Sequence, residues 1–183
     1  MYNMKIKTAA ASLVLLMIAG LATAANSLAP VKDKDGPDLP SPLCDRVRVP
    51  VGNKLHSRVY ADGVQIYRWD GISWVLVGPD ATLFANANCD GKVGKHYVGP
   101  TWESNSGSKV VGTRMYGCSP DTTAIPWLLL EAVSTSGPGI YSSVTYIQRA
   151  NTKGGLPPAG PGSFIGETVQ VPYTAEYYFY REQ

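Results

Sequence analysis

The sequence predicts an all-β domain, either an antiparallel β-sandwich or a closed β-barrel of about eight or nine short strands. Short apolar and β-branched runs alternate with turn residues along most of the chain. No stretch keeps a helical apolar period over many positions, so helices are not expected. Neighbouring short strands joined by tight turns form a meander. So many strands bury their apolar faces only in two packed sheets or in a closed barrel.

The expected strands are separated by residue pairs that favour tight turns. These turn signals are Asp62-Gly63, Asp70-Gly71, Asp90-Gly91, Ser106-Gly107 and the run from Ser136 to Gly139. The strands expected around them are residues 54–61, 64–69, 74–77, 82–84, 93–98, 109–115, 127–135, 140–149 and 173–181. Residues 127–130 and 177–180 are apolar or aromatic on both faces, which predicts strands that are covered on both sides. Residues 151–166 are too rich in Gly and Pro for regular structure.

The first 24 residues resemble a secretory signal peptide. Lys5 and Lys7 precede an uncharged apolar run, and small residues end the segment at Ala24. The run is shorter than the roughly 20 residues that span a bilayer, so we expect cleavage after Ala24 and no stable membrane insertion afterwards. The product is expected to be secreted or periplasmic. Residues 25–48 are expected to form a disordered, Pro-rich N-terminal arm, and residues 49–183 a single β domain.

The charge balance argues against nucleic acid as a partner. Removal of Lys5 and Lys7 with the leader leaves 14 basic residues against 14 acidic ones, which gives no field to hold phosphates. The chain contains no dinucleotide-binding glycine motif after a strand, no nucleophile elbow and no cluster with metal-ligand spacing. We therefore expect neither a cofactor nor a metal. The oligomeric state is left open.

Aromatic and amide side chains suggest a ligand site. Period-two alternation places Gln65, Tyr67 and Trp69 on one face of a strand, and a turn around Gly71 would bring Trp74 opposite Tyr67 or Trp69. Flat rings cover the C–H surface of a sugar while amides bind its hydroxyls. The candidate site for a small polar molecule or glycan consists of Gln65, Tyr67, Trp102, Glu103, Tyr146 and Gln148. The alternative is that these rings only pack the core.

Two other functions are considered. In the first, Glu103 beside Trp102 has a raised pKa and shares acid and base roles with His96, as in a small secreted hydrolase or isomerase. This pairing requires the chain to fold back at Gly99-Pro100; otherwise Glu103 binds turn amides and His96 is exposed. In the second, the protein is a structural, stress-related extracellular protein without a ligand. A non-catalytic binding or envelope-associated domain is preferred over both.

Three cysteines follow the leader, so at most one internal disulfide forms. Cys89 and Cys118 lie at similar distances from an expected turn near residues 105–107, which makes them the preferred pair. Cys44 can instead pair with either one.

Several long strings carry a family resemblance: GVQIYRW, GPTWES, GSKVVG, IPWLLLEAVSTSGPG, VTYIQRANTKGG and VPYTAEYYFYR. They resemble the domain-of-unknown-function family 3455 of secreted bacterial and fungal proteins, over about residues 49–181. The resemblance implies no reaction, ligand or catalytic residue. Many members have one Cys at the position of Trp69 and another near Ser163. The resemblance therefore implies that any disulfide between these two positions is absent here and that a bond between Cys89 and Cys118 can replace it.

Overall fold

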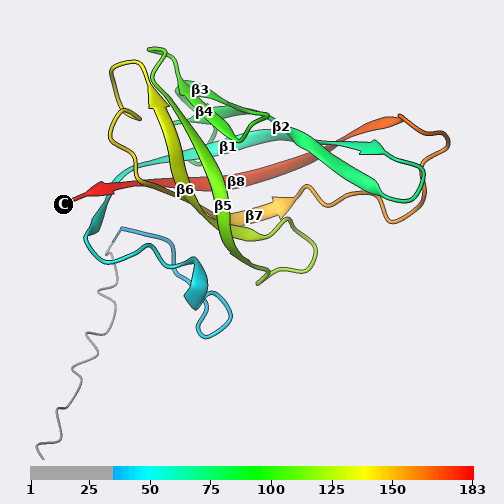
Figure 1. The fold of residues 1–183 in the computed structure, drawn as a ribbon, viewed down its shortest axis with the longest axis horizontal. Helices are drawn as coiled ribbons and strands as arrows, with labels where there is room; N and C mark the ends of the chain where they lie inside the picture. The colour runs from blue at the N-terminus through cyan, green and yellow to red at the C-terminus, as the bar shows by residue number, and fades with distance from the viewer. Residues whose placement is uncertain (1–34) are drawn as a thin grey trace, which may run out of the picture. The chain divides into compact units, whose positions relative to one another are not determined.

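The computed structural model describes residues 35–183, which form a closed barrel of eight antiparallel strands. Each strand pairs with the next one in the chain, and the last strand pairs with the first to close the sheet (Figure 1). The predicted all-β fold is confirmed, and of the two architectures it is the barrel. The expected signal peptide, its cleavage site and residues 25–34 of the expected arm lie outside the described residues.

A short 3-10 turn precedes the barrel. The elements are η1 (Asp45–Val47), β1 (Asn53–Trp69), β2 (Trp74–Phe84), β3 (Lys92–Tyr97), β4 (Thr101–Ser104), β5 (Lys109–Cys118), β6 (Trp127–Ser136), β7 (Tyr146–Gly154) and β8 (Thr168–Glu182). Among the described residues, no helix is long and apolar enough to cross a membrane.

The pair Asp62-Gly63 does not turn the chain, which differs from the prediction. Gly63 lies inside the long strand β1 and pairs with Ala81 on one side and Tyr173 on the other. A side chain there would meet the neighbouring strand, since an ideal Cβ would lie 2.3 Å from the Asp80 carbonyl oxygen. Gly63 therefore permits close approach of two backbones, which is the other common role of glycine in strands. The expected strands 54–61 and 64–69 are one strand as a result.

The inner face of the barrel holds the main hydrophobic core. Alternate residues of β8 point inward, among them Tyr173, Tyr177 and Phe179, and they pack against side chains from the other strands. Trp102 of β4 reaches deep into this core because Gly112 on β5 leaves space; a Cβ on Gly112 would lie 3.3 Å from the indole. Burial of these large rings removes much apolar surface from water and stabilises the closed sheet.

A second cluster covers the outer face of β6, β7 and β8. There the N-terminal segment, which we define as residues 39–49, packs over strand residues that point away from the barrel interior: Cys118, Trp127, Leu129, Ala150, Tyr178 and Tyr180. Cys44 and Val47 of this segment are fully buried. This second layer explains why residues 127–130 and 177–180 are apolar on both faces, as predicted. It also means that the segment from residue 39 packs on the barrel rather than extending freely.

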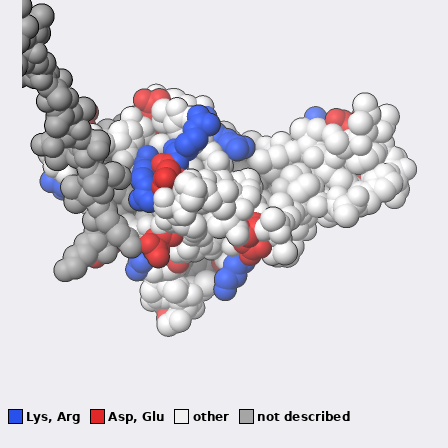
Figure 2. Space-filling model, turned by 90° about the horizontal axis from the view of Figure 1, so that it is seen from below, with Lys and Arg blue, Asp and Glu red and all other residues white. Residues whose placement is uncertain are grey.

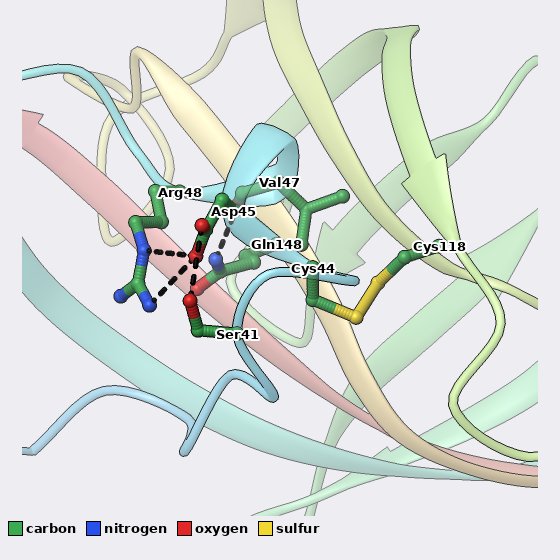
Figure 3. A network of polar contacts seen from close by, with 7 residues as sticks. All are labelled: Ser41, Cys44, Asp45, Val47, Arg48, Cys118 and Gln148. Atoms are coloured by element: carbon green, nitrogen blue, oxygen red, sulfur yellow. Dashed lines mark hydrogen bonds and ion pairs between the residues drawn. A yellow bond between two sulfur atoms is a disulfide. The ribbon is translucent and has the colours of Figure 1, made fainter.

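The predicted disulfide between Cys89 and Cys118 is wrong. Cys118 is bonded to Cys44, and Cys89 is free and exposed (Figure 3). The hairpin argument failed because residues 93–118 form three strands rather than two, so Cys118 does not return to the side of Cys89. The bridge fastens the N-terminal segment to β5.

Beside the disulfide, Gln148 fixes the segment by hydrogen bonds. Its Nε2 donates to the Val47 carbonyl oxygen at 2.6 Å, and its Oε1 accepts from the Tyr180 hydroxyl at 2.9 Å. Within the segment, Asp45 accepts hydrogen bonds from Ser41 and Arg48 (Figure 3).

Three strands run on beyond the barrel as a projecting ribbon, which we define as residues 64–79 and 155–172 (Figure 1). In it the end of β1 lies between the beginning of β2 and the beginning of β8. The β1–β2 turn closes with Trp69 paired to Trp74, as one of the sequence alternatives predicted. The Gly- and Pro-rich loop after β7 forms the other side of the ribbon's end.

Removal of the disulfide should destabilise the protein. The double variant Cys44→Ala/Cys118→Ala should lose about 4 kcal/mol in the free energy of unfolding, because a bridge between residues 74 apart restricts the unfolded chain. Urea denaturation of the oxidised proteins measures the difference. The matched control is Cys89→Ala, whose exposed thiol makes no bridge and whose loss should leave the midpoint unchanged. A wild-type protein in which peptide mapping finds Cys89 in the disulfide would contradict this pairing.

Candidate functional site

Three of the six residues predicted to bind a ligand are almost completely buried: Gln65, Tyr67 and Trp102. Trp102 points into the barrel, whereas Gln65 and Tyr67 lie at the base of the ribbon, against Gly155. The Tyr67 hydroxyl donates to the Gly155 carbonyl oxygen at 2.6 Å, and burial raises the pKa of this phenol above its usual range. Gly155 has a positive φ of 80°, and a Cβ on it would lie 2.8 Å from that of Tyr173, so only glycine fits at this contact. These side chains pack the core instead of lining a surface pocket.

Trp102 belongs to a ring cluster in the same interior. Its indole stacks on His96 with ring centroids 4.3 Å apart, and Tyr177 packs edge-on against both. His96 Nδ1 lies 2.9 Å from the Thr101 carbonyl oxygen, which only accepts, so this nitrogen carries the proton. Burial, together with the positive charge of Arg149, lowers the pKa of His96 to about 3 despite the opposing hydrogen bond. His96 is therefore a neutral core residue at physiological pH.

Glu103 lies on the opposite face of the barrel wall from His96. Its Oε2 accepts from the Tyr97 hydroxyl at 2.8 Å and lies 3.5 Å from Lys95 Nζ and 3.4 Å from Lys109 Nζ. The hydrogen bond from Tyr97, and then the two lysines, hold the pKa of Glu103 below its usual value. The expectation of a raised pKa is thus wrong. Because one side chain points inward and the other outward, the two cannot share a proton as an acid–base pair.

Tyr146 and Gln148 lie elsewhere again, on the outer face beneath the N-terminal segment. The six residues are consequently divided among the interior, the outer face at β4 and the covered face at β7. Within residues 35–183, no three His, Cys, Asp or Glu side chains gather as metal ligands. The structure thus does not bring the six residues together at one surface pocket.

A cleft at the end of the ribbon gathers aromatic and proline side chains on the surface. Its volume is about 450 Å³. The lining residues are Trp69, Ile72, Ser73 and Trp74 from the β1–β2 turn and residues Pro157 to Pro161 from the loop that precedes β8. We call this the ribbon cleft. The Trp69 and Trp74 rings lie 5.5 Å apart and are tilted by 59°. The two sides of the cleft are separated by more than 80 residues of sequence but meet in the fold.

Hydrogen bonds hold both sides of the cleft in place. Trp74 Nε1 donates to the Gly160 carbonyl oxygen at 2.9 Å, which ties the turn to the loop. On the turn side, Asp70 Oδ1 accepts from the backbone amides of Ile72 and Ser73 at 2.8 and 2.7 Å. These hydrogen bonds lower the pKa of Asp70, the one from the Ser73 amide most strongly, so the carboxylate stays ionised. The cleft is thus preformed, with flat apolar walls and a few polar groups.

Two other hollows differ from the ribbon cleft in their lining. One, of about 420 Å³ at the base of the ribbon, is mostly aliphatic, with Lys95, Asp80 and Tyr97 among its residues. The other, of about 500 Å³, lies near the chain's end and is lined by Ser142, Ser143, Thr145, Arg181 and neighbours. Neither contains a tryptophan, so the ribbon cleft is the best candidate for binding by ring faces.

Sequence reasoning did not predict this cleft. The residues around Gly71 predicted that Trp74 pairs with either Tyr67 or Trp69, and the loop at residues 151–166 was interpreted only as irregular. One signal pointed to the contact: the family resemblance implies one cysteine at the position of Trp69 and another near Ser163, a spacing that suits segments lying side by side. The structure brings these places together, since a Cβ on Gly162 would lie 2.5 Å from the Trp69 ring. The Trp69 ring therefore packs directly against Gly162.

The comparison with known families agrees with the resemblance. The family described as Protein of unknown function (DUF3455) matches residues 50–181 of the 183-residue chain. The chain belongs to this family. No curated protein and no solved structure matches it. The DUF3455 match covers the whole barrel and the ribbon but not η1 or Cys44, so the matched region contains only one partner of the disulfide.

The buried His96 should make stability depend on pH. Its folded-state pKa of about 3 lies below the usual 6.5, so the unfolded chain binds a proton in the window between them and the folded chain does not. The contribution of His96 to the free energy of unfolding is therefore fully present above about pH 7. It decreases as the pH falls, by about 2 kcal/mol between pH 8 and pH 5. Urea denaturation across this range, where carboxylates stay ionised, measures the slope.

The variant His96→Gln should flatten this slope, whatever its own stability. The matched control His56→Gln removes the other histidine, which contacts the Ile140 carbonyl oxygen near the surface, and should keep the slope. An equal slope in wild type and His96→Gln would show that His96 is not the titrating group.

Proposed function

We propose that this chain is an exported, non-catalytic binding domain and that its ribbon cleft takes a small polar, carbohydrate-like ligand. The observation that carries the proposal is the cleft itself: two tryptophan rings face a proline-rich loop across a preformed surface hollow. Ring faces and pyrrolidine rings pack well against the C–H surface of a sugar. None of the six residues that the sequence suggested lines this cleft, so the proposed site is a different one and centres on Trp69 and Trp74.

The polar groups around the cleft suit a ligand with hydroxyls. Ser73 contributes a hydroxyl oxygen, and the loop from Pro157 to Pro161 contributes backbone carbonyls, four of its five residues being Pro or Gly. Prolines cannot donate a backbone hydrogen bond, so the loop offers mainly acceptors. A neutral molecule with several hydroxyl donors complements such a surface. No charged side chain lines the cleft, which favours a neutral ligand over an ionic one.

Export is supported by the expected leader and by the disulfide. The Cys44–Cys118 bridge is almost completely buried, and such structural disulfides persist in oxidising compartments outside the cytoplasm. The hydrolase or isomerase alternative lacks support, because His96 is a neutral core residue and Glu103 is held ionised on the outer face. A structural protein without a ligand is the alternative against which the experiment decides.

The test is a binding screen with neutral mono- and oligosaccharides on the protein beginning at Ala25. Saturable binding is expected, and Trp74→Ala should weaken it roughly tenfold, because a stacked ring contributes about 1 kcal/mol or more. Isothermal titration calorimetry measures both affinities, and circular dichroism checks that the variant is folded.

The matched control is Tyr116→Ala, which removes a partly exposed ring that lies against Arg46 of the N-terminal segment and does not line the cleft. This variant should bind as tightly as wild type. If no saccharide binds, the chain is better described as a structural protein. Binding that survives Trp74→Ala unchanged would place the ligand outside the ribbon cleft.

A further inference from the structure

The end of the ribbon carries an apolar surface that the proposed ligand does not explain. The ribbon has 34 of the 149 described residues but seven of their fourteen exposed large apolar side chains: Ile72, Val75, Leu76, Val77, Leu156, Phe164 and Ile165. The most exposed three lie at its outer end: Ile72 is 88 %, Ile165 76 % and Phe164 65 % exposed. We call these three the ribbon tip. Large apolar side chains grouped in this way mark an interaction surface.

The ribbon tip is a preformed unit although its two loops are distant in sequence. The Trp69 amide donates to the Glu167 carbonyl oxygen, and the Gly166 amide donates to the Trp69 carbonyl oxygen, both at 2.8 Å. The two loops also touch, since a Cβ on Gly71 would lie 3.2 Å from Ile165 Cγ1. Binding through the tip therefore needs no ordering of a flexible segment, which lowers its entropic cost.

The ribbon contains few charges. Its charged residues are Arg68, Asp70 and Glu167, one basic against two acidic. Both carboxylates accept hydrogen bonds from backbone amides of their own loops: Asp70 from Ile72 and Ser73, and Glu167 from Ser163. Figure 2 shows the projecting part of the molecule almost free of coloured residues, whereas lysine, arginine and carboxylate side chains gather on the barrel. No cluster of basic residues is present there to attract anionic headgroups.

Two tryptophans stand directly behind the ribbon tip. Trp69 and Trp74 form the last cross-strand pair before the turn that holds Ile72. Tryptophan favours the boundary between hydrocarbon and water, because its ring is apolar and its N–H is polar. The order along the ribbon is thus the most exposed apolar groups first, then the indoles, then the less exposed side chains of residues 75–77, and then the barrel. Side chains that enter a lipid surface follow this order.

We propose that the ribbon tip inserts shallowly and reversibly into an electrically neutral lipid surface. The occupant is a lipid phase because the tip projects from the molecule's end (Figure 1), and a fluid phase accommodates such a shape without a matching pocket. It is neutral because the ribbon carries no basic cluster. Insertion extends only to the apolar side chains, since ionised Asp70 stays at headgroup level. Ile72 also lines the ribbon cleft, but Phe164 and Ile165 do not, so the tip can be tested separately from any ligand in the cleft.

The experiment titrates the full-length mature protein with phosphatidylcholine vesicles and records tryptophan emission. Trp102 and Trp127 are already buried, so a shift to shorter wavelength reports on Trp69 and Trp74. We expect such a shift together with sedimentation of the protein with the vesicles. Adding phosphatidylglycerol, or raising the salt concentration, should change the partition constant less than twofold.

Variants locate the contact. Ile72→Ser and Ile165→Ser should each lower the partition constant roughly tenfold or more, because each removes several buried carbons from the lipid contact. The matched controls are Val51→Ser and Val133→Ser, which remove exposed aliphatic side chains from the barrel and should bind vesicles as wild type does. Ile165→Ser separates the two proposals, because Ile165 does not line the ribbon cleft: this variant should weaken vesicle binding while saccharide binding persists.

Three results would overturn the proposal. Absence of any partition into neutral vesicles would leave the tip as a contact for another protein. Partition that appears only with phosphatidylglycerol and disappears in salt would assign binding to the basic residues of the barrel. An equal decrease of the partition constant in the tip variants and in the Val51 and Val133 controls would show that adsorption is nonspecific.

Discussion

The pairing of β1 with β8 is the constraint on which the rest of the structure depends. The two strands are the longest in the barrel and pair from Asn53 with Glu182 to Arg68 with Thr168. The larger part of this pairing, up to Gly63 with Tyr173, closes the barrel and so removes the free sheet edges that would otherwise attract other chains. The remaining pairs, from Val64 with Pro172 to Arg68 with Thr168, continue beyond the barrel into the ribbon. The cleft and the tip thus rest on the same hydrogen-bond ladder that seals the core.

The fold class was predictable because strand periodicity and turn residues are local. The length of β1 was not predictable. Gly63 has the sequence signature of a turn, but in the fold it allows β1 to lie close to the backbone of β2. The sequence around Gly63 does not show that this neighbouring strand is there. The runs at residues 127–130 and 177–180 did indicate a second covering layer. Nothing in them identified that layer as the N-terminal segment, and the choice of Cys44 as disulfide partner depends on that packing.

The candidate site shows the same limit. Alternation correctly grouped Gln65 with Tyr67 on one face, but it could not tell whether that face looked into the barrel or into solvent. Trp102 and His96 likewise reached the interior because Gly112 leaves room for the indole on the facing strand. The aromatic side chains that line a surface cleft are instead Trp69 and Trp74, which are half-buried beyond the barrel's end. Their opposite wall, the loop at Pro157 to Pro161, has no periodicity from which a contact could be inferred.

Closure by the first and last strands also governs how the chain can fold. The residues that seal the sheet are separated by more than a hundred positions, so the decisive contacts have high contact order and form late. Until β8 arrives, β1 presents an unpaired edge and the interior rings lie open to water. During synthesis the C-terminal strand emerges last, and every nascent molecule passes through this open-sided stage. Chaperones that shield strand edges would therefore act on this protein before its final residues are available.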